Sequence, residues 1–318
     1  EAFEKRMTKL EGGVGSVACA SGMAALTMAL MNILRSGDHV VAAAGLYGGT
    51  GELLDELKAY GITTTYVREN TPQAFEAEIT PQTKVVFAET IGNPKLDVTD
   101  IQGVAEIAHK HGIPFLVDNT VATPYLVNPL KLGADIVIHS SSKYINGSSD
   151  AISGILISGG SFKWNAEKFP GMAEFKKFGP FAYLAKLRNG LFRSMGVCLA
   201  PQNAFLNTLG LETLGLRMQR HCSNAMELAE FLTSEQAQLE RYEALNYGPS
   251  NVNALANDAV ASNLALSALA EQSNYAVTQL VLGGFWVPAE AFGAELEAHT
   301  TADLQTLLDQ LVEQASEG

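Results

Sequence analysis

Short apolar runs alternate with amphipathic stretches along the first half of the chain. Apolar runs rich in β-branched residues predict strands at residues 39–43, 63–67, 84–88, 115–118, 136–139 and 152–158. Between them, helical spacing of apolar residues predicts helices such as 51–60 and 101–111, several of them ended by a glycine: Gly61, Gly112 and Gly133. This alternation predicts an α/β fold with a doubly wound, mostly parallel sheet.

The pattern changes in the second half of the chain. Residues 161–200 form a less regular connector with glycine, proline and aromatic residues, and a long helical pattern follows over about 203–232. After Arg241 there is no lysine or arginine, where the chain-wide frequency predicts roughly five. Residues 302–314 again carry a helical stripe of leucines. We therefore expect a large domain over 1–195 and a smaller C-terminal α+β domain over 196–318, incomplete after about residue 241.

Residues 14–34 carry no charge and are about long enough to cross a membrane. Small and polar residues such as Gly15, Ser16 and Asn32 interrupt the stretch, so it predicts a buried helix of a soluble protein with a glycine-rich entrance. The acidic opening Glu1-Ala2-Phe3-Glu4 lacks the basic region of a signal peptide.

The charge and the cysteine content indicate which binding partners and which cellular compartment to expect. The formal net charge of −13 argues against nucleic acid or an anionic membrane surface as a partner. Three scattered cysteines, Cys19, Cys198 and Cys222, suggest neither a metal site nor a disulfide framework. We expect a cytoplasmic protein without a metal site.

A short segment with polar residues follows each of four predicted strands. The four segments are LYGGT from Leu46, ETIGNP from Glu89, DNT from Asp118 and SSSK from Ser140. Doubly wound sheets bind ligands beyond the carboxyl ends of their strands. We therefore expect all four segments to contribute to one site.

Asp118 and Lys143 indicate the chemistry of that site. A carboxylate can keep a pyridine nitrogen protonated, a lysine can hold an aldehyde as a Schiff base, and the hydroxyls of Ser140 and Ser142 suit a phosphate. These groups together predict a pyridoxal 5'-phosphate (PLP) site, with the Lys143 amine buried and therefore nucleophilic. The alternatives are a surface lysine at a strand–loop boundary and an aspartate that only stabilises a turn.

Other residues could complete the site. Gly22-Met23 lies where a loop meets a helix, and helix N–H groups there attract phosphate. Tyr47 could stack on a ring and act as an acid or base, or it could be half-buried beside a glycine turn. Asn93 could donate to a ring hydroxyl or a carboxylate, or it could serve a turn before Pro94. We assign no chemistry to the histidines: His109 and His111 suit a solvated helix end, and His139 a packed strand.

Five motifs together resemble the Cys/Met-metabolism PLP-dependent enzymes. They are ASGMAAL, LYGGT, ETIGNPKL, VDNTVATPYLVNPLKLGADIVIHSSSKYING and GLETLGLRMQRHCSNA, and the resemblance covers roughly residues 1–232. It implies a PLP-dependent transferase-like fold of type I and a homotetramer built from active dimers.

The resemblance also implies a role for each matching residue. Lys143 would form the Schiff base, Asp118 would pair with the pyridine nitrogen, and Tyr47 would stack on the ring and take part in catalysis. The remaining cofactor contacts would be a phosphate cradle and two ring neighbours: Ser21, Gly22, Met23, Ser140 and Ser142 at the phosphate, Thr120 beneath the ring, and Asn93 near its hydroxyl.

Within the family, the chain looks most like the O-acetylhomoserine sulfhydrylases. Gly49 stands where methionine γ-lyases typically carry cysteine, and residues 162–196 also favour a sulfhydrylase. The implied reaction belongs to methionine biosynthesis: a sulfide donor replaces acetate on O-acetylhomoserine and gives homocysteine. Methionine γ-lyase and cystathionine γ-synthase or lyase chemistry remain alternatives on the same site.

Two departures from the family keep a non-catalytic scaffold open as another alternative. The N-terminal segment that donates a tyrosine and an arginine to a neighbour's phosphate is absent ahead of Glu1, and the arginine that binds the substrate carboxylate has no match after Arg241. We expect that a segment carrying this arginine is omitted. A nucleotide-binding oxidoreductase is disfavoured, because the chain has neither G-x-G-x-x-G after the first strand nor G-x-x-x-x-G-K-[ST].

Overall fold

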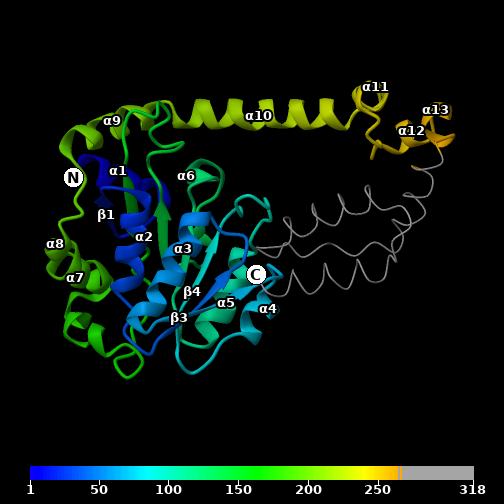
Figure 1. Ribbon diagram of the computed structural model, residues 1–318. Helices are drawn as coiled ribbons and strands as arrows, with labels where there is room; N and C mark the ends of the chain where they lie inside the picture. Colours follow the sequence, from blue (N-terminus) through cyan, green and yellow to red (C-terminus); the bar gives the residue numbers. More distant parts are fainter. Residues whose placement is uncertain (264–265, 267–318) are drawn as a thin grey trace. The chain divides into compact units, whose positions relative to one another are not determined.

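A computed structural model describes residues 1–263 and 266 of the chain (Figure 1). The chain divides into two compact units, Glu1–Met226 and Glu227–Gly318. The domain boundary expected at residue 195 stays a prediction, and the helix expected over 302–314 lies outside the described residues.

The first unit is built on a seven-stranded sheet in the order β1-β7-β6-β5-β4-β2-β3. Its strands are β1 (Gly15–Cys19), β2 (His39–Ala43), β3 (Thr63–Val67), β4 (Thr83–Glu89), β5 (Phe115–Asp118), β6 (Ile136–His139) and β7 (Gly154–Ser158). The strands from β6 to β3 pair in parallel, whereas β7 is antiparallel to both β6 and β1. The prediction of a mostly parallel sheet is therefore confirmed.

Helices cover the sheet, since β2, β6 and β7 are buried along their whole length. The helices of this part are α1 (Ala2–Glu11), α2 (Gly22–Met31), α3 (Gly48–Glu56), α4 (Pro72–Ala77), α5 (Ile101–Lys110) and α6 (Thr123–Leu126), with 3-10 turns Leu57–Tyr60 and Pro129–Leu132 (Figure 1). Gly61, Gly112 and Gly133 all have positive φ, as helix ends often require.

The prediction of one buried helix over residues 14–34 is wrong in its first part. Gly15–Cys19 forms the edge strand β1, paired with β7, and α2 begins only at Gly22. Ser21 separates the two elements: its backbone is extended, and its Oγ accepts a hydrogen bond from Ala24 N at 3.0 Å. Among the described residues, no helix is long and apolar enough to span a membrane.

Residues 161–200 contain more helix than predicted. They include the 3-10 segment η3 (Pro170–Phe181), α7 (Ala182–Asn189) and α8 (Leu191–Met195). Aromatic rings pack this region: Trp164 stacks on Tyr183 with ring centroids 5.7 Å apart and meets Phe169 edge-on at 5.2 Å.

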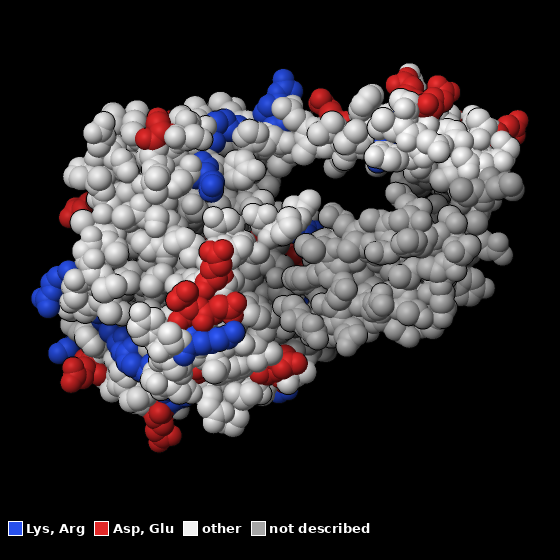
Figure 2. All heavy atoms as spheres, viewed as in Figure 1, with Lys and Arg blue, Asp and Glu red and all other residues white. Residues whose placement is uncertain are grey.

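The helix predicted over 203–232 is two helices, α9 (Pro201–Glu212) and α10 (Leu214–Thr233), which are separated at Thr213. In the second unit the described helices are α11 (Glu235–Leu245), α12 (Val252–Leu255) and α13 (Asp258–Ala261). On the face shown in Figure 2, acidic and basic side chains of the described residues lie interspersed, even though the chain carries a net charge of −13.

Candidate active site

A cavity of about 840 Å³ lies in the first unit, where the parallel strands end. All the side chains and glycines that the sequence proposed for cofactor binding or catalysis line it: Ser21, Gly22, Met23, Tyr47, Asn93, Asp118, Thr120, Ser140, Ser142 and Lys143. The four polar strand-end segments therefore meet at one site, as the parallel sheet predicts.

Two carboxylates lie side by side on the floor of this cavity. Glu89 and Asp118 are the last residues of β4 and β5 and are paired in register. Asp118 Oδ1 accepts a hydrogen bond from Thr120 N at 2.9 Å, and Glu89 Oε1 accepts one from Tyr47 N at 2.7 Å. The sequence had not singled out Glu89, although ETIGNP marks it as a strand-end residue.

The electrostatics of the pair favour a cation. Burial, together with the neighbouring charge of Asp118, raises the pKa of Glu89 to about 8. Burial also raises the pKa of Asp118, although the Thr120 hydrogen bonds oppose this shift. No lysine, arginine or histidine in the described part of the chain forms an ion pair with either carboxylate. A positively charged ring nitrogen placed here would offset the repulsion between them.

The opposite side of the cavity has the features of a phosphate cradle. A Cβ on Gly22 would lie 2.7 Å from Ser140 Cβ and 2.9 Å from its Cα, so only glycine lets the start of α2 approach the end of β6 this closely. The first N–H groups of α2 have no acceptor within the helix and face negative charge favourably.

The two serines of this cradle differ. Ser140 Oγ makes no hydrogen bond to a described residue and can donate into the cavity. By contrast, Ser142 Oγ donates to Ser153 O at 3.0 Å and accepts from Ser153 N at 2.8 Å. Ser142 therefore lines the cavity while its hydroxyl ties two backbone segments together.

Lys143 lies in the turn that follows β6. Its N–H donates to Ser140 O at 3.1 Å, and its carbonyl accepts from Gly147 N at 2.8 Å, so the backbone of the turn is held on both sides. The expectation that its side chain is buried is wrong: Lys143 is exposed and borders the cavity. The reason is its place beyond the strand end, where the cavity opens over the turn.

Tyr47 and Thr120 complete the ring region of the cavity. Tyr47 is 51% exposed, and a Cβ on Gly49 would lie only 2.8 Å from its Cε1. Gly49 therefore leaves room for the present position of the Tyr47 ring. Thr120 Oγ1 accepts a hydrogen bond from Ser140 N at 2.8 Å and so joins the ends of β5 and β6.

Arg217 on α10 was missed by the sequence reasoning as a site residue. Its Nη1 donates to Tyr144 O at 2.6 Å and its Nη2 to Gly210 O at 2.8 Å, while Nε donates to Thr213 Oγ1 at 3.0 Å. Arg217 thus anchors the residue next to Lys143 to the helical segment behind it. In the sequence, Arg217 stands in the motif GLETLGLRMQR. This motif supports the family resemblance, but the resemblance gave Arg217 no role.

His139 lies behind the cavity and is fully buried. Its Nε2 lies 2.6 Å from Glu11 Oε1, which also accepts from Asn119 Nδ2 at 3.0 Å. This agrees with the interpretation of His139 as a packed strand residue. No group of potential metal ligands occurs among the described residues.

Comparison with known proteins decides the family. Residues 1–267 match the family described as Cys/Met metabolism PLP-dependent enzyme. The chain belongs to this family. Two curated relatives are O-acetyl-L-homoserine sulfhydrylases. That of Leptospira meyeri is 43% identical over 251 residues, which cover 73% of this chain and 57% of the relative. That of Corynebacterium glutamicum is 41% identical over 263 residues, which cover 78% of this chain and 59% of the relative. The L-methionine gamma-lyase of Pseudomonas putida is 41% identical over 246 residues, covering 76% and 56%.

Solved structures give the same result. The O-acetylhomoserine sulfhydrylase of Wolinella succinogenes matches with a TM-score of 0.68 and 40% identity, covering 73% of this chain and 67% of that one. A putative O-acetylhomoserine (thiol)-lyase of Campylobacter jejuni, which carries a pyridoxyl-lysine phosphate, matches with a TM-score of 0.68 and 35% identity, covering 73% and 60%. The chain spans somewhat more than half the length of the curated relatives it matches.

The cavity fits the cofactor of this PLP-dependent family. No cation among the described residues pairs with Glu89 or Asp118, the Gly22–Ser140 contact leaves a cradle at a helix start, and Lys143 offers an amine at the edge of the same cavity. The carboxylates would hold the ring nitrogen, the cradle would hold the phosphate, and Lys143 would hold the aldehyde carbon.

Proposed function

We propose that the protein containing this chain catalyses γ-replacement on O-acetylhomoserine, in which a sulfide donor displaces acetate and homocysteine forms. The observation that carries the proposal is the convergence of Asp118, Lys143 and the Gly22 cradle on one cavity in a chain about 40% identical to sulfhydrylases. The small-molecule substrates would therefore be an O-acylated amino acid and a sulfur donor.

When bound, PLP withdraws electrons from the bonds at the substrate Cα. The chain's own residues would supply positioning and proton transfer around it. Asp118 would keep the ring nitrogen protonated, and Tyr47 would stack on the ring. The Lys143 amine, free of ion pairs with the described residues, would accept and return protons at Cα and Cβ.

Gly49 supports a sulfhydrylase over a methionine γ-lyase, because the family resemblance places a cysteine at this position in the lyases. A side chain at position 49 would begin with a Cβ 2.8 Å from the tyrosine ring and would displace it. Methionine γ-lyase activity is still the second candidate, because the Pseudomonas putida enzyme is 41% identical.

A substrate panel tests the proposal. The purified protein would be assayed with O-acetylhomoserine, O-succinylhomoserine, cystathionine and methionine, each with and without sulfide. We expect sulfide-dependent homocysteine from O-acetylhomoserine to be the fastest product. A faster release of methanethiol from methionine would favour the lyase, and inactivity on the whole panel with PLP bound would favour the scaffold alternative.

We also propose, from the family resemblance, a homotetramer built from active dimers that works in the cytoplasm. Light scattering coupled to size-exclusion chromatography tests the assembly, and a monomer at micromolar concentration would contradict it.

A further inference from the structure

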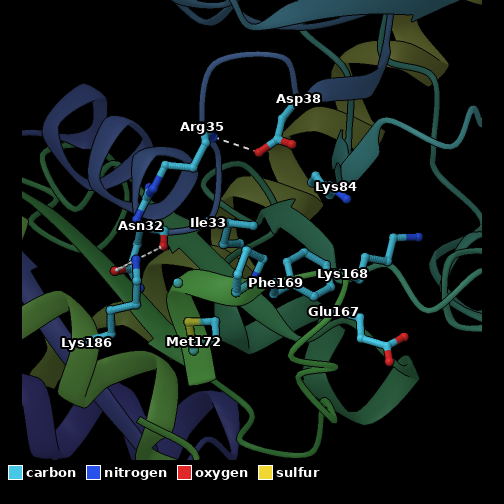
Figure 3. A pocket seen from close by; sticks show the side chains of 12 residues that line it. Asn32, Ile33, Arg35, Asp38, Lys84, Glu167, Lys168, Phe169, Met172 and Lys186 are labelled. Carbon is cyan, nitrogen blue, oxygen red and sulfur yellow. Dashed lines mark hydrogen bonds between the residues drawn. The ribbon is translucent and has the colours of Figure 1, made fainter. Parts of the chain in front are cut away.

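A second cavity, of about 220 Å³, lies near the amino-terminal end of β4, away from the strand ends that form the cofactor cavity (Figure 3). Lys84, near the start of β4, lines this cavity, whereas Glu89, at the end of the same strand, lines the cofactor cavity. The other walls come from the segment after α2, from residues 167–172 and from α7. Four basic side chains line it: Arg35, Lys84, Lys168 and Lys186.

Lys186 and Arg35 form the first pair of like charges. Lys186 is only 9% exposed, and its Nζ donates to the backbone oxygen of Asn32 and, at 3.2 Å, to Asn32 Oδ1. Arg35 Nη1 donates to Leu34 O at 2.6 Å and to Met31 O at 3.1 Å. Burial and then the charge of Arg35 lower the pKa of Lys186 to about 8.

Lys84 and Lys168 form the second pair. Lys168 Nζ donates to His111 O at 2.8 Å, and Lys84 Nζ lies 5.9 Å from the centroid of the Phe169 ring. Burial and then the charge of Lys84 lower the pKa of Lys168. Each pair therefore contains a cation whose charged state is destabilised by its neighbour.

The acidic residues of this cavity leave the four cations without ion pairs. Asp38 and Glu167 line it too, but the Asp38 carboxylate accepts the backbone N–H of Arg35 at 2.7 Å. Among the described residues, none of the four cations makes a salt bridge. Four cations against two carboxylates make the cavity positive, in a chain whose net charge is −13.

The carboxyl-terminal end of α2 neutralises only part of this positive charge. A helix C-terminus carries about half a negative charge, which one cation more than neutralises. Here Lys186 and Arg35 both bind carbonyls of this end, and Lys84 and Lys168 lie apart from it. Gly171 keeps the space beside the first pair open, because a Cβ there would lie 3.2 Å from Arg35 Nη2 and 3.5 Å from Lys186 Cε.

We propose that this cavity binds a small phosphate-type oxyanion, either inorganic phosphate or a small phosphate monoester, at a site separate from the cofactor. An oxyanion can accept hydrogen bonds from several lysine and arginine donors at once and would offset the repulsion within both pairs. Asn32, Phe169 and Gly171 shape the cavity around these donors.

The test is calorimetric titration of the PLP-saturated protein with inorganic phosphate, at constant ionic strength maintained with chloride. Saturation with PLP keeps phosphate out of the cofactor cradle, and visible absorbance checks that the cofactor stays bound. We expect one phosphate site per chain. A parallel titration with glycerol phosphate distinguishes the sources: tighter binding than phosphate indicates an ester ligand, and weaker binding indicates the free ion.

The double variant Lys84→Gln/Lys168→Gln should weaken phosphate binding at least about tenfold, since each charged hydrogen bond contributes on the order of one such factor. Lys163→Gln removes an exposed charge outside the cavity lining and should leave binding unchanged. Circular dichroism and PLP content verify that both variants are folded. The proposal is overturned if the wild-type protein binds no phosphate, if the double variant binds it as tightly as the wild type, or if Lys163→Gln weakens binding equally.

Discussion

Replacing Glu89 with glutamine should remove a pH-dependent loss of stability from the cofactor-free protein. Glu89 is 6% exposed, lies in register with Asp118, and accepts the Tyr47 N–H. Glutamine keeps the shape and an acceptor oxygen but cannot ionise. The substitution therefore removes the cost of ionising a buried carboxyl group that lies beside Asp118.

The size and sign of the effect follow from the raised pKa. Burial and Asp118 raise the pKa of Glu89 from 4.5 to about 8, so the folded chain keeps a proton that the unfolded chain releases in this window. The contribution of Glu89 to stability is therefore complete at low pH and decreases as the pH rises from about 4.5 to about 8. At about 1.4 kcal/mol per pKa unit, the wild type should lose about 4 kcal/mol more than the variant between about pH 5 and about pH 8.

Urea unfolding of both proteins across this pH range measures the difference. Glu52→Gln, at an exposed position on α3 with no ion pair to a described residue, is the matched control and should follow the wild type. Added PLP should reduce the decline in the wild type, because its pyridinium cation favours ionised carboxylates. Parallel stability curves for the wild type and Glu89→Gln would refute the reasoning.

Three further substitutions test the cradle and the lysine turn. Gly22→Ala places a Cβ 2.7 Å from Ser140 Cβ, so it should cost about 1–3 kcal/mol in urea unfolding and weaken PLP binding in spectroscopic titration; unchanged values for both would contradict the cradle. Ser140→Ala should weaken PLP binding about tenfold, because its hydroxyl makes no hydrogen bond to a described residue and can donate, and it should leave the urea midpoint nearly unchanged. Arg217→Met removes charged hydrogen bonds to three carbonyls and should lower the free energy of unfolding by about 3 kcal/mol. Arg220→Met, at an exposed position on the same helix, should have little effect.

The central strands were predictable because their residues meet two demands at once. A parallel strand covered on both faces needs a continuous apolar run, and 39–43, 115–118 and 136–139 carry such runs between helix signals. Residues 63–67 form the partly exposed edge strand β3, and their β-branched and aromatic side chains predicted it instead. The structure places strands at these residues with the same bounds.

The other edge strand, β1, was less predictable. Gly15–Cys19 is made largely of small residues that suit a helix or a strand, and its pairing with β7 decides the outcome. The division between α9 and α10 at Thr213 is likewise a tertiary feature, because Gly210 of α9 packs against the carbonyls of the Lys143 turn.

Most site residues could be predicted because they follow the carboxyl ends of parallel strands. Parallel strands deliver their carboxyl ends to one edge, so polar residues following four strands had to meet. Glu89 escaped notice because its role depends on the register that places it beside Asp118. Arg217 escaped because it acts on the backbone of a turn more than 70 residues away, which no local pattern reveals.

The most direct test of the central claim, that this cavity holds PLP on Lys143, is borohydride reduction of the PLP-loaded protein followed by peptide mass spectrometry. Reduction makes a lysine–pyridoxyl linkage permanent and so marks the residue that holds the aldehyde. We predict a single phosphopyridoxyl group on the peptide that contains Lys143, and its loss in Lys143→Ala. Labelling of a different lysine, or no labelling of a protein saturated with PLP, would contradict the account.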